Sequence, residues 1–248
     1  MVQTAQTQHC PIMHNRPRCP SPKYTAPNGA ALSSTTPVRA VVFDYGMVLT
    51  GPPDQAAYDQ LLAITGLSPA QFEKYYWADR HAYDEGKLTG LQFWEKILAD
   101  ADLKLYPSAA TELNLWDARM WTTQNRVMLA WQAALQERGI LTAILSNMGD
   151  SVLENMKREF NWLSHFDVLV WSYQLRMAKP DPAIFHHVLK QLGTSPEETI
   201  FIDDKLVNVE AANALGIRGF LFTTAAQLRA DLIAQGLDAT LPLPNPTP

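Results

Sequence analysis

Cysteine, basic charge and long apolar runs are all scarce in this chain of 248 residues. Its two cysteines, Cys10 and Cys19, lie near the start, which argues against a disulfide scaffold and is compatible with a reducing compartment. The net charge of -5 provides no basic surface for nucleic acid. No apolar run approaches the roughly 20 residues that a membrane-spanning helix requires. We therefore expect a cytoplasmic protein, monomeric or homodimeric, with neither a nucleic-acid partner nor a membrane partner.

The composition is that of an ordinary globular protein, with 47% hydrophobic and 18% charged residues. Residues 1–39 differ from the rest, because they are rich in Pro, Ser, Thr and Gln and have no apolar period. They also lack the apolar core of a secretory signal, so we predict a disordered leader. The last stretch, "LPLPNPTP" (241–248), is predicted to be a loose tail, since prolines continue neither a helix nor a central strand.

Five short apolar runs predict β-strands, at residues 40–45, 141–147, 166–172, 199–204 and 219–223. The runs are continuous rather than alternating, as expected for a parallel sheet that is covered on both faces by helices. Helical segments separate most of the runs, and several of these segments end at glycine, a common helix stop. The pattern predicts an α/β fold with a doubly wound parallel sheet.

Residues 51–125 break this alternation, because they contain amphipathic helical pieces and no good strand. Their place directly after the first strand predicts a helical cap above the carboxyl ends of the sheet, where open α/β sheets bind ligands. The chain therefore divides into a leader (1–39), a core domain (40–50 and 126–240), a cap domain (51–125) and a tail (241–248).

Polar side chains gather at the predicted carboxyl ends of the strands. They are Asp44 after the first strand, Ser146 and Asn147 after the second, Asp203 and Asp204 after the fourth, and Lys179 in the loop "KPDP". Because the carboxyl ends of parallel strands share one edge, we expect these side chains to lie together. Several carboxylates beside a lysine and a hydroxyl favour a divalent cation and an anionic substrate, and hard oxygen ligands suit Mg2+.

Each of these residues also has an ordinary structural explanation. An aspartate at a strand end is usually a turn or cap residue, and the pair Ser146 and Asn147 can cap the next helix. Lys179 alone is most often a solvated lysine, and "KPDP" can start a helix through its proline. Two adjacent acids near a buried edge are harder to explain in this way, since they repel each other unless a cation lies between them.

Four stretches carry a family resemblance: "FDYGMVL", "LSNM", "KPDPAIF" and "IDDKLVN". In order and separation they resemble the four motifs of the haloacid dehalogenase (HAD) superfamily, over about residues 38–237. The resemblance implies a HAD-like Rossmannoid core with a small helical cap. The cap segment "YDEGKLTGLQFWEKI" is similar to that of members which include glucose-1-phosphate phosphatases and the phosphatase domain of soluble epoxide hydrolases.

The resemblance also implies roles for the residues at the strand ends. Asp44 would be the nucleophile that forms an aspartyl-phosphate. Ser146, next to Asn147, would hydrogen-bond a phosphoryl oxygen, and Lys179 would neutralise charge. Mg2+ would be held by Asp44, the carbonyl group of Gly46 and Asp204, with Asp203 close by and Asn208 acting behind these ligands. Cation neutralisation of this kind lets a carboxylate approach an anionic phosphoryl group.

Gly46 departs from the pattern of many phosphatases in the superfamily, which carry a second Asp, a general acid, two residues after the nucleophile. We expect Gly46 to let the chain turn away from the strand. General acid catalysis contributes typically about 10² to 10⁴-fold, so its loss should penalise poor leaving groups most. The departing oxygen must then leave as an anion or take a proton from water, a cap residue or the substrate. The glucose-1-phosphate phosphatase branch resembles this chain in having Gly at this position.

The sequence favours a Mg2+-dependent phosphatase that acts on a small phosphorylated metabolite. One alternative is a 2-haloacid dehalogenase, which uses the same Asp on carbon without a metal. Dehalogenases resemble one another in a Tyr two residues after the nucleophile and lack the "DD" of the fourth motif, so "IDDKLVN" favours the metal enzyme. The other alternative is a binding protein on a retired catalytic fold, for which Gly46 is the only argument.

Overall fold

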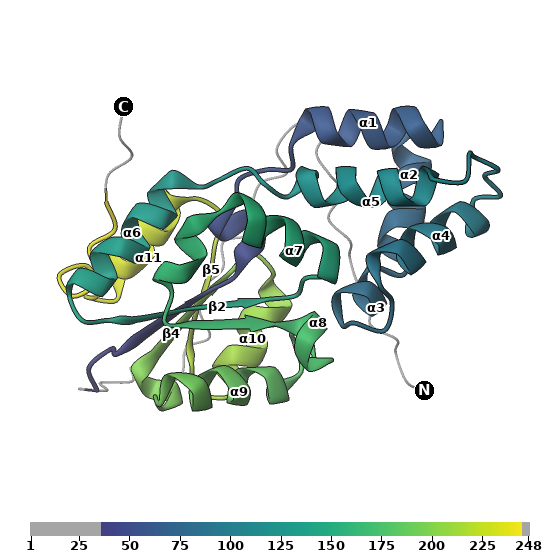
Figure 1. Ribbon diagram of the computed structural model, residues 1–248. Helices are drawn as coiled ribbons and strands as arrows, with labels where there is room; N and C mark the ends of the chain where they lie inside the picture. The colour runs from purple at the N-terminus through teal and green to yellow at the C-terminus, as the bar shows by residue number, and fades with distance from the viewer. Residues whose placement is uncertain (1–35, 245–248) are drawn as a thin grey trace, which may run out of the picture.

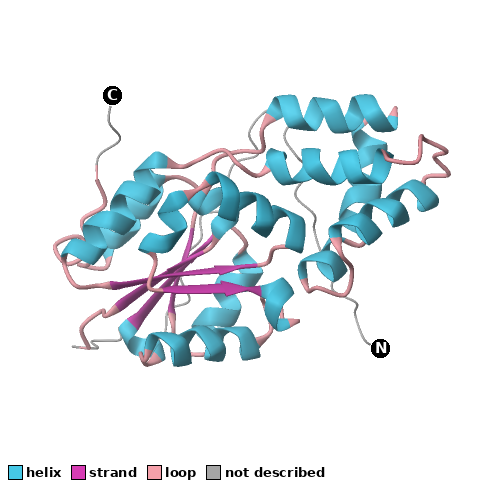
Figure 2. Ribbon diagram, in the orientation of Figure 1, coloured by secondary structure: helices cyan, strands magenta, loops and turns pink. Residues whose placement is uncertain are grey.

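A parallel sheet forms the centre of the molecule in a computed structural model that describes residues 36–244. Within these residues the sheet has five strands in the order β3-β2-β1-β4-β5, and every neighbouring pair is parallel. The strands are β1 (Ala40–Phe43), β2 (Leu141–Ser146), β3 (Val168–Trp171), β4 (Thr199–Asp203) and β5 (Arg218–Leu221). The doubly wound α/β fold is confirmed, and Figure 2 shows helices on both sides of the sheet.

Helices cover both faces because the side chains of each strand alternate between two apolar cores. Phe43 and Ile144 belong to one core, with α6 (Arg126–Glu137), α7 (Asp150–Glu159) and α11 (Ala225–Ala234). Their neighbours Val42 and Leu145 belong to the other core, with α9 (Pro182–Leu192) and α10 (Leu206–Ala214). Four short elements complete this part: η1 (Tyr45–Leu49), η2 (Asn161–His165), α8 (Ser172–Leu175) and η3 (Pro196–Glu198). The carboxyl ends of the strands are thereby fixed relative to one another.

A second group of helices follows η1 and lies beyond the carboxyl ends of β2 and β3, on the right of Figure 1. It consists of α1 (Gln55–Thr65), α2 (Pro69–Ala78), α3 (Arg80–Asp84), α4 (Gly90–Asp100) and α5 (Ala109–Met120). These helices have their own aromatic core, which includes Phe72, Tyr76 and Trp94. An isolated bridge between Thr50 and Gln124, together with hydrogen bonds beside it such as that from the N–H of Asn125 to the carbonyl of Leu49, joins the two connecting segments. We keep the division into a core domain and a cap at residues 51–125 as a proposal.

Parts of both predicted loose ends are ordered, which corrects the prediction for residues 36–39 and 241–244. Val38 is buried, and the N–H of Arg39 donates to the carbonyl of Glu198, so the order begins inside the predicted leader of residues 1–39. At the other end Leu241 and Leu243 are buried in the core, although prolines surround them. An extended proline-rich segment can pack when a side chain supplies its hydrogen bonds, and Arg229 donates to the carbonyl of Leu243 at 3.0 Å. Residues 1–35 and 245–248, the remainder of the two predictions, lie outside the described residues.

Among the described residues we find no helix with the length and apolar character needed to cross a membrane.

Candidate active site

Three carboxyl groups meet where β1 and β4 end. Phe43 and Ile202 are register partners in these parallel strands, and the N–H of Asp44 donates to the carbonyl of Ile202 at 2.8 Å. Asp44 therefore lies beside Asp203 and Asp204, and a carboxylate oxygen of each lies within 4.8 Å of the others. The sequence predicted this meeting, because neighbouring parallel strands end at one edge.

Lys179 joins two of these acids from a loop that precedes α9. Its Nζ lies 2.9 Å from Oδ1 of Asp44 and 2.6 Å from Oδ2 of Asp203, and the lysine side chain is only 1% exposed. Burial alone would lower the pKa of this ammonium, but the two carboxylates outweigh it and raise the pKa of Lys179. The lysine is therefore charged, and it holds the nucleophile candidate Asp44 in place.

Asp203 is fully buried and surrounded by donors. Besides Lys179, it accepts hydrogen bonds from the backbone N–H of Lys205 at 2.8 Å and from Nδ2 of Asn208 at 3.1 and 3.0 Å. Asn208 therefore hydrogen-bonds Asp203, the residue that precedes the predicted ligand Asp204. Asp203 orients Lys179 in this structure, while Asp204 remains partly exposed beside Asp44.

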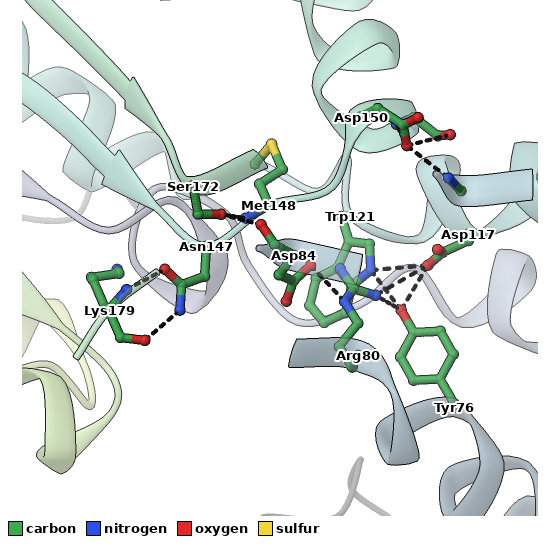
Figure 3. A network of polar contacts seen from close by, with 12 residues as sticks. Tyr76, Arg80, Asp84, Asp117, Trp121, Asn147, Met148, Asp150, Ser172 and Lys179 are labelled. Atoms are coloured by element: carbon green, nitrogen blue, oxygen red, sulfur yellow. Dashed lines mark hydrogen bonds and ion pairs between the residues drawn. The ribbon is translucent and has the colours of Figure 1, made fainter. Parts of the chain in front are cut away.

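Asn147 holds the backbone of the lysine loop. Its Oδ1 accepts from the N–H of Lys179 and its Nδ2 donates to the carbonyl of Lys179, both at 2.8 Å, as Figure 3 shows. The sequence placed Asn147 at the correct edge but did not reveal this contact. Ser146, the last residue of β2, is buried at the same edge, and its predicted contact with a phosphoryl oxygen stays a prediction.

Ser172 is a contact residue that the sequence reasoning missed. It directly follows β3, and its Oγ accepts from the N–H of Met148 at 2.9 Å and donates to the carbonyl of Asp84 in the helical cap region. Ser172 could have been identified in the same way as the other candidate residues, because it is a polar residue at the carboxyl end of a predicted strand. Ser172 therefore ties the loop after β2 to the helices of residues 51–125.

Burial and mutual repulsion both disfavour the ionised forms of Asp44 and Asp204. Burial raises the pKa of Asp44, Lys179 opposes this rise, and Asp203 adds to it. Burial, together with the charges of Asp44 and Asp203, raises the pKa of Asp204 to about 7. Carboxylates that repel one another in a partly buried site are relieved by a cation, and an all-oxygen donor set fits Mg2+. The residues present therefore fit a magnesium ion.

Gly46 does not need the conformational freedom of glycine. Its φ is -63° and its ψ is 132°, and a Cβ built on Gly46 would meet no atom within 4 Å. The left-handed residue of this turn is Met47, with φ of 59°, whose N–H donates to Oγ1 of Thr50 at 3.0 Å. The expectation that Gly46 lets the chain turn is therefore wrong, because the next residue makes the turn.

A parallel sheet that gathers three acids and a buried lysine at its carboxyl edge, beside inserted helices, has the organisation of a HAD-like hydrolase. The model of the haloacid dehalogenase-like hydrolase family matches residues 38–216. The chain belongs to this family and is a hydrolase, which confirms the resemblance of its four motifs.

The chain is also similar to three known proteins. It is 35% identical over 130 residues to bifunctional epoxide hydrolase 2 of Rattus norvegicus, covering 48% of this chain and 23% of the relative. It is 28% identical over 204 residues to phosphoglycolate phosphatase 1 of Pseudomonas aeruginosa, covering 73% of this chain and 67% of the relative. A HAD family enzyme of Bacteroides thetaiotaomicron, solved with magnesium and inorganic phosphate, matches with a TM-score of 0.63 and 22% identity, covering 75% of this chain and 94% of that one. The chain thus spans less than a quarter of the rat protein.

Proposed function

We propose that the protein is a Mg2+-dependent phosphatase that acts on a small phosphorylated metabolite through an aspartyl-phosphate. The observation that carries the proposal is the contact of Asp44 with Lys179, beside the acids Asp203 and Asp204. A carboxylate restrained by a buried ammonium is positioned for attack on phosphorus, and splitting hydrolysis into two steps makes each easier. The phosphatase name of the Pseudomonas relative agrees with this proposal.

Each residue of the site has a separate role in the proposed reaction. Asp44 attacks phosphorus, Lys179 neutralises phosphoryl charge, and Ser146 donates to a phosphoryl oxygen. Asp44, the carbonyl of Gly46 and Asp204 would hold Mg2+, with Asp203 and Asn208 fixing the surroundings. When bound, Mg2+ would offset the negative charge that otherwise keeps a carboxylate away from a phosphate. The magnesium bound to the Bacteroides enzyme supports this choice of ion.

The runner-up is 2-haloacid dehalogenation, in which Asp44 attacks carbon and a halide leaves. Two features of this chain disfavour it. Asp204 stands beside the nucleophile with a raised pKa, which metal-free chemistry on carbon does not require. Gly46 also occupies the position at which dehalogenases resemble one another in carrying Tyr.

The test is a panel of phosphomonoesters and haloacids assayed with Mg2+ or with chelator. We expect turnover of aryl phosphates such as p-nitrophenyl phosphate only with Mg2+, and none in Asp44→Asn, because the amide keeps the shape but loses the charge for attack. Asp59→Asn is the matched control, since Asp59 is an exposed helical residue outside the acid cluster. Full turnover in chelator, or halide release without metal, would refute the phosphatase proposal.

A further inference from the structure

The loop that follows β2 contacts the candidate site through its first residue. Asn147 holds the backbone of Lys179 with two hydrogen bonds of 2.8 Å, one to the N–H and one to the carbonyl. The side chain of Lys179 in turn lies 2.9 Å from Oδ1 of Asp44. A displacement of this loop would therefore act directly on the residue that restrains the nucleophile candidate.

Met148, the second residue of the loop, reaches the cap through Ser172. The side chain of Ser172 is fully buried, and its Oγ accepts from the N–H of Met148 at 2.9 Å. The same hydroxyl donates its hydrogen to the carbonyl of Asp84, the last residue of α3. A hydroxyl group can accept and donate at the same time. Ser172 thus connects a cap carbonyl with a backbone N–H that lies one residue from Asn147, as Figure 3 shows.

The next two residues of the loop meet the cap directly. Gly149 has ordinary dihedral angles, φ of -75° and ψ of 170°, but a Cβ built there would overlap the buried ring of Tyr83. Oδ1 of Asp150 accepts from the N–H of Gly90, the first residue of α4, at 2.9 Å. Three consecutive loop residues therefore contact the cap, directly or through Ser172, and the residue before them holds Lys179.

We propose that Ser172 is a positioning residue, through which docking of the cap on the core restrains Lys179 in the site. The inference rests on the proposed phosphatase function. With the cap docked, the carbonyl of Asp84 orients the hydroxyl, whose lone pair holds the N–H of Met148. Asn147 is thereby kept in register with the lysine loop. When the cap moves away, the hydroxyl loses its acceptor and can turn from Met148, so Lys179 is less firmly held beside the nucleophile.

The test is a double-mutant cycle of Ser172→Ala and Asn147→Ala, assayed with p-nitrophenyl phosphate and Mg2+. In the wild-type background we expect Ser172→Ala to lower kcat/KM by about 5-fold, which corresponds to one hydrogen bond of about 1 kcal/mol. In the Asn147→Ala background the same change should lower it by about 2-fold or less, because the loop no longer holds Lys179. A serine that only attaches the cap predicts equal fold losses in both backgrounds. That result, or an unchanged kcat/KM in Ser172→Ala, overturns the proposal.

Thr199→Val is the matched control for the loss of a buried hydroxyl. Oγ1 of Thr199 donates to the carbonyl of Ser195 at 2.9 Å, at the amino end of β4 and thus at the sheet edge opposite the site. This variant should lower the Tm, as Ser172→Ala does, but leave kcat/KM unchanged. If Ser172→Ala does not fold, Ser172→Cys replaces it in the cycle, because a thiol occupies the same place as a weaker hydrogen-bonding group.

Gly149→Ala tests the contribution of the cap separately. Its methyl group would press on Tyr83 without straining the backbone, so we expect a lower kcat/KM and, in the Asn147→Ala background, a smaller loss. Gly51→Ala is the control, since a Cβ there comes no closer than 3.5 Å to Thr123. Wild-type kcat/KM in Gly149→Ala would show that cap docking does not reach the site. If the wild-type protein hydrolyses no phosphomonoester, the proposed function itself fails.

Discussion

Lys179 illustrates how single residues hold this site together. A fully buried ammonium is stable only when partners compensate its loss of hydration, and here two carboxylates do so at 2.9 and 2.6 Å. Asp203 is in turn saturated by Asn208 and by a backbone N–H, so it cannot rotate away. The position of the nucleophile candidate Asp44 thus depends, through Lys179, on the contacts that Asp203 makes with Asn208 and with the backbone.

Asn147→Ala tests whether the position of Lys179 depends on the hydrogen bonds that Asn147 makes with its backbone. The change removes two hydrogen bonds of 2.8 Å, each worth about 1 kcal/mol, so the lysine loop should loosen. If all of that energy serves to position Lys179, kcat/KM for an aryl phosphate falls by at most roughly 30-fold, the equivalent of about 2 kcal/mol. Steady-state kinetics provide the measurement, with Asn161→Ala as control because Asn161 is exposed. Unaltered kinetics in Asn147→Ala would show that the loop needs no such support.

At the scale of elements, the sheet was predictable because buried parallel strands are continuous apolar runs. All five strands lie within a residue or two of the predicted ranges, but the first ends at Phe43 because the apolar Tyr45 belongs to the following turn. Helix α11, with the sequence "AAQLRADLIA", is absent from the predicted helices. The edge on which the site lies follows from topology, whereas the contacts of Lys179 with Asp203 and of Asn147 with the lysine loop depend on side-chain packing between distant segments. A sequence shows no such packing.

The cap turn of Gly86 offers a prediction at this scale. Gly86 and Gly66 both have positive φ, 79° and 67°, but only at Gly86 would a Cβ meet the core, 2.6 Å from the carbonyl of Tyr173. Alanine should cost roughly 1 to 2 kcal/mol of stability at either position because of the left-handed backbone. Only Gly86→Ala should also push the cap from the core and lower kcat/KM. Thermal unfolding and kinetics of the two variants separate these effects, and equal activity of both would show that cap contact at Tyr173 is dispensable.

The whole molecule carries a net negative charge, and its candidate site concentrates that charge. With Asp44, Asp203 and Asp204 ionised, the single buried ammonium of Lys179 leaves an excess of negative charge at the place where an anionic substrate must bind. A divalent cation would correct this imbalance, which links binding of the ion to the stability of the fold.

This link predicts that rising pH lowers the stability of the metal-free protein but increases the stabilisation that magnesium provides. The pKa of Asp204 is raised from 3.8 to about 7, so between these values the folded protein binds more protons than the unfolded chain. Stability therefore falls as pH rises through this window when a chelator is present. Magnesium favours the ionised carboxylates, so it should raise the Tm more at pH 8 than at pH 5. Thermal unfolding followed by circular dichroism measures both trends.

Other groups titrate as well, so the comparison is with Asp204→Asn, which should flatten the pH dependence and reduce the magnesium effect. A wild-type Tm that responds to magnesium equally at both pH values would mean that Asp204 is not a ligand.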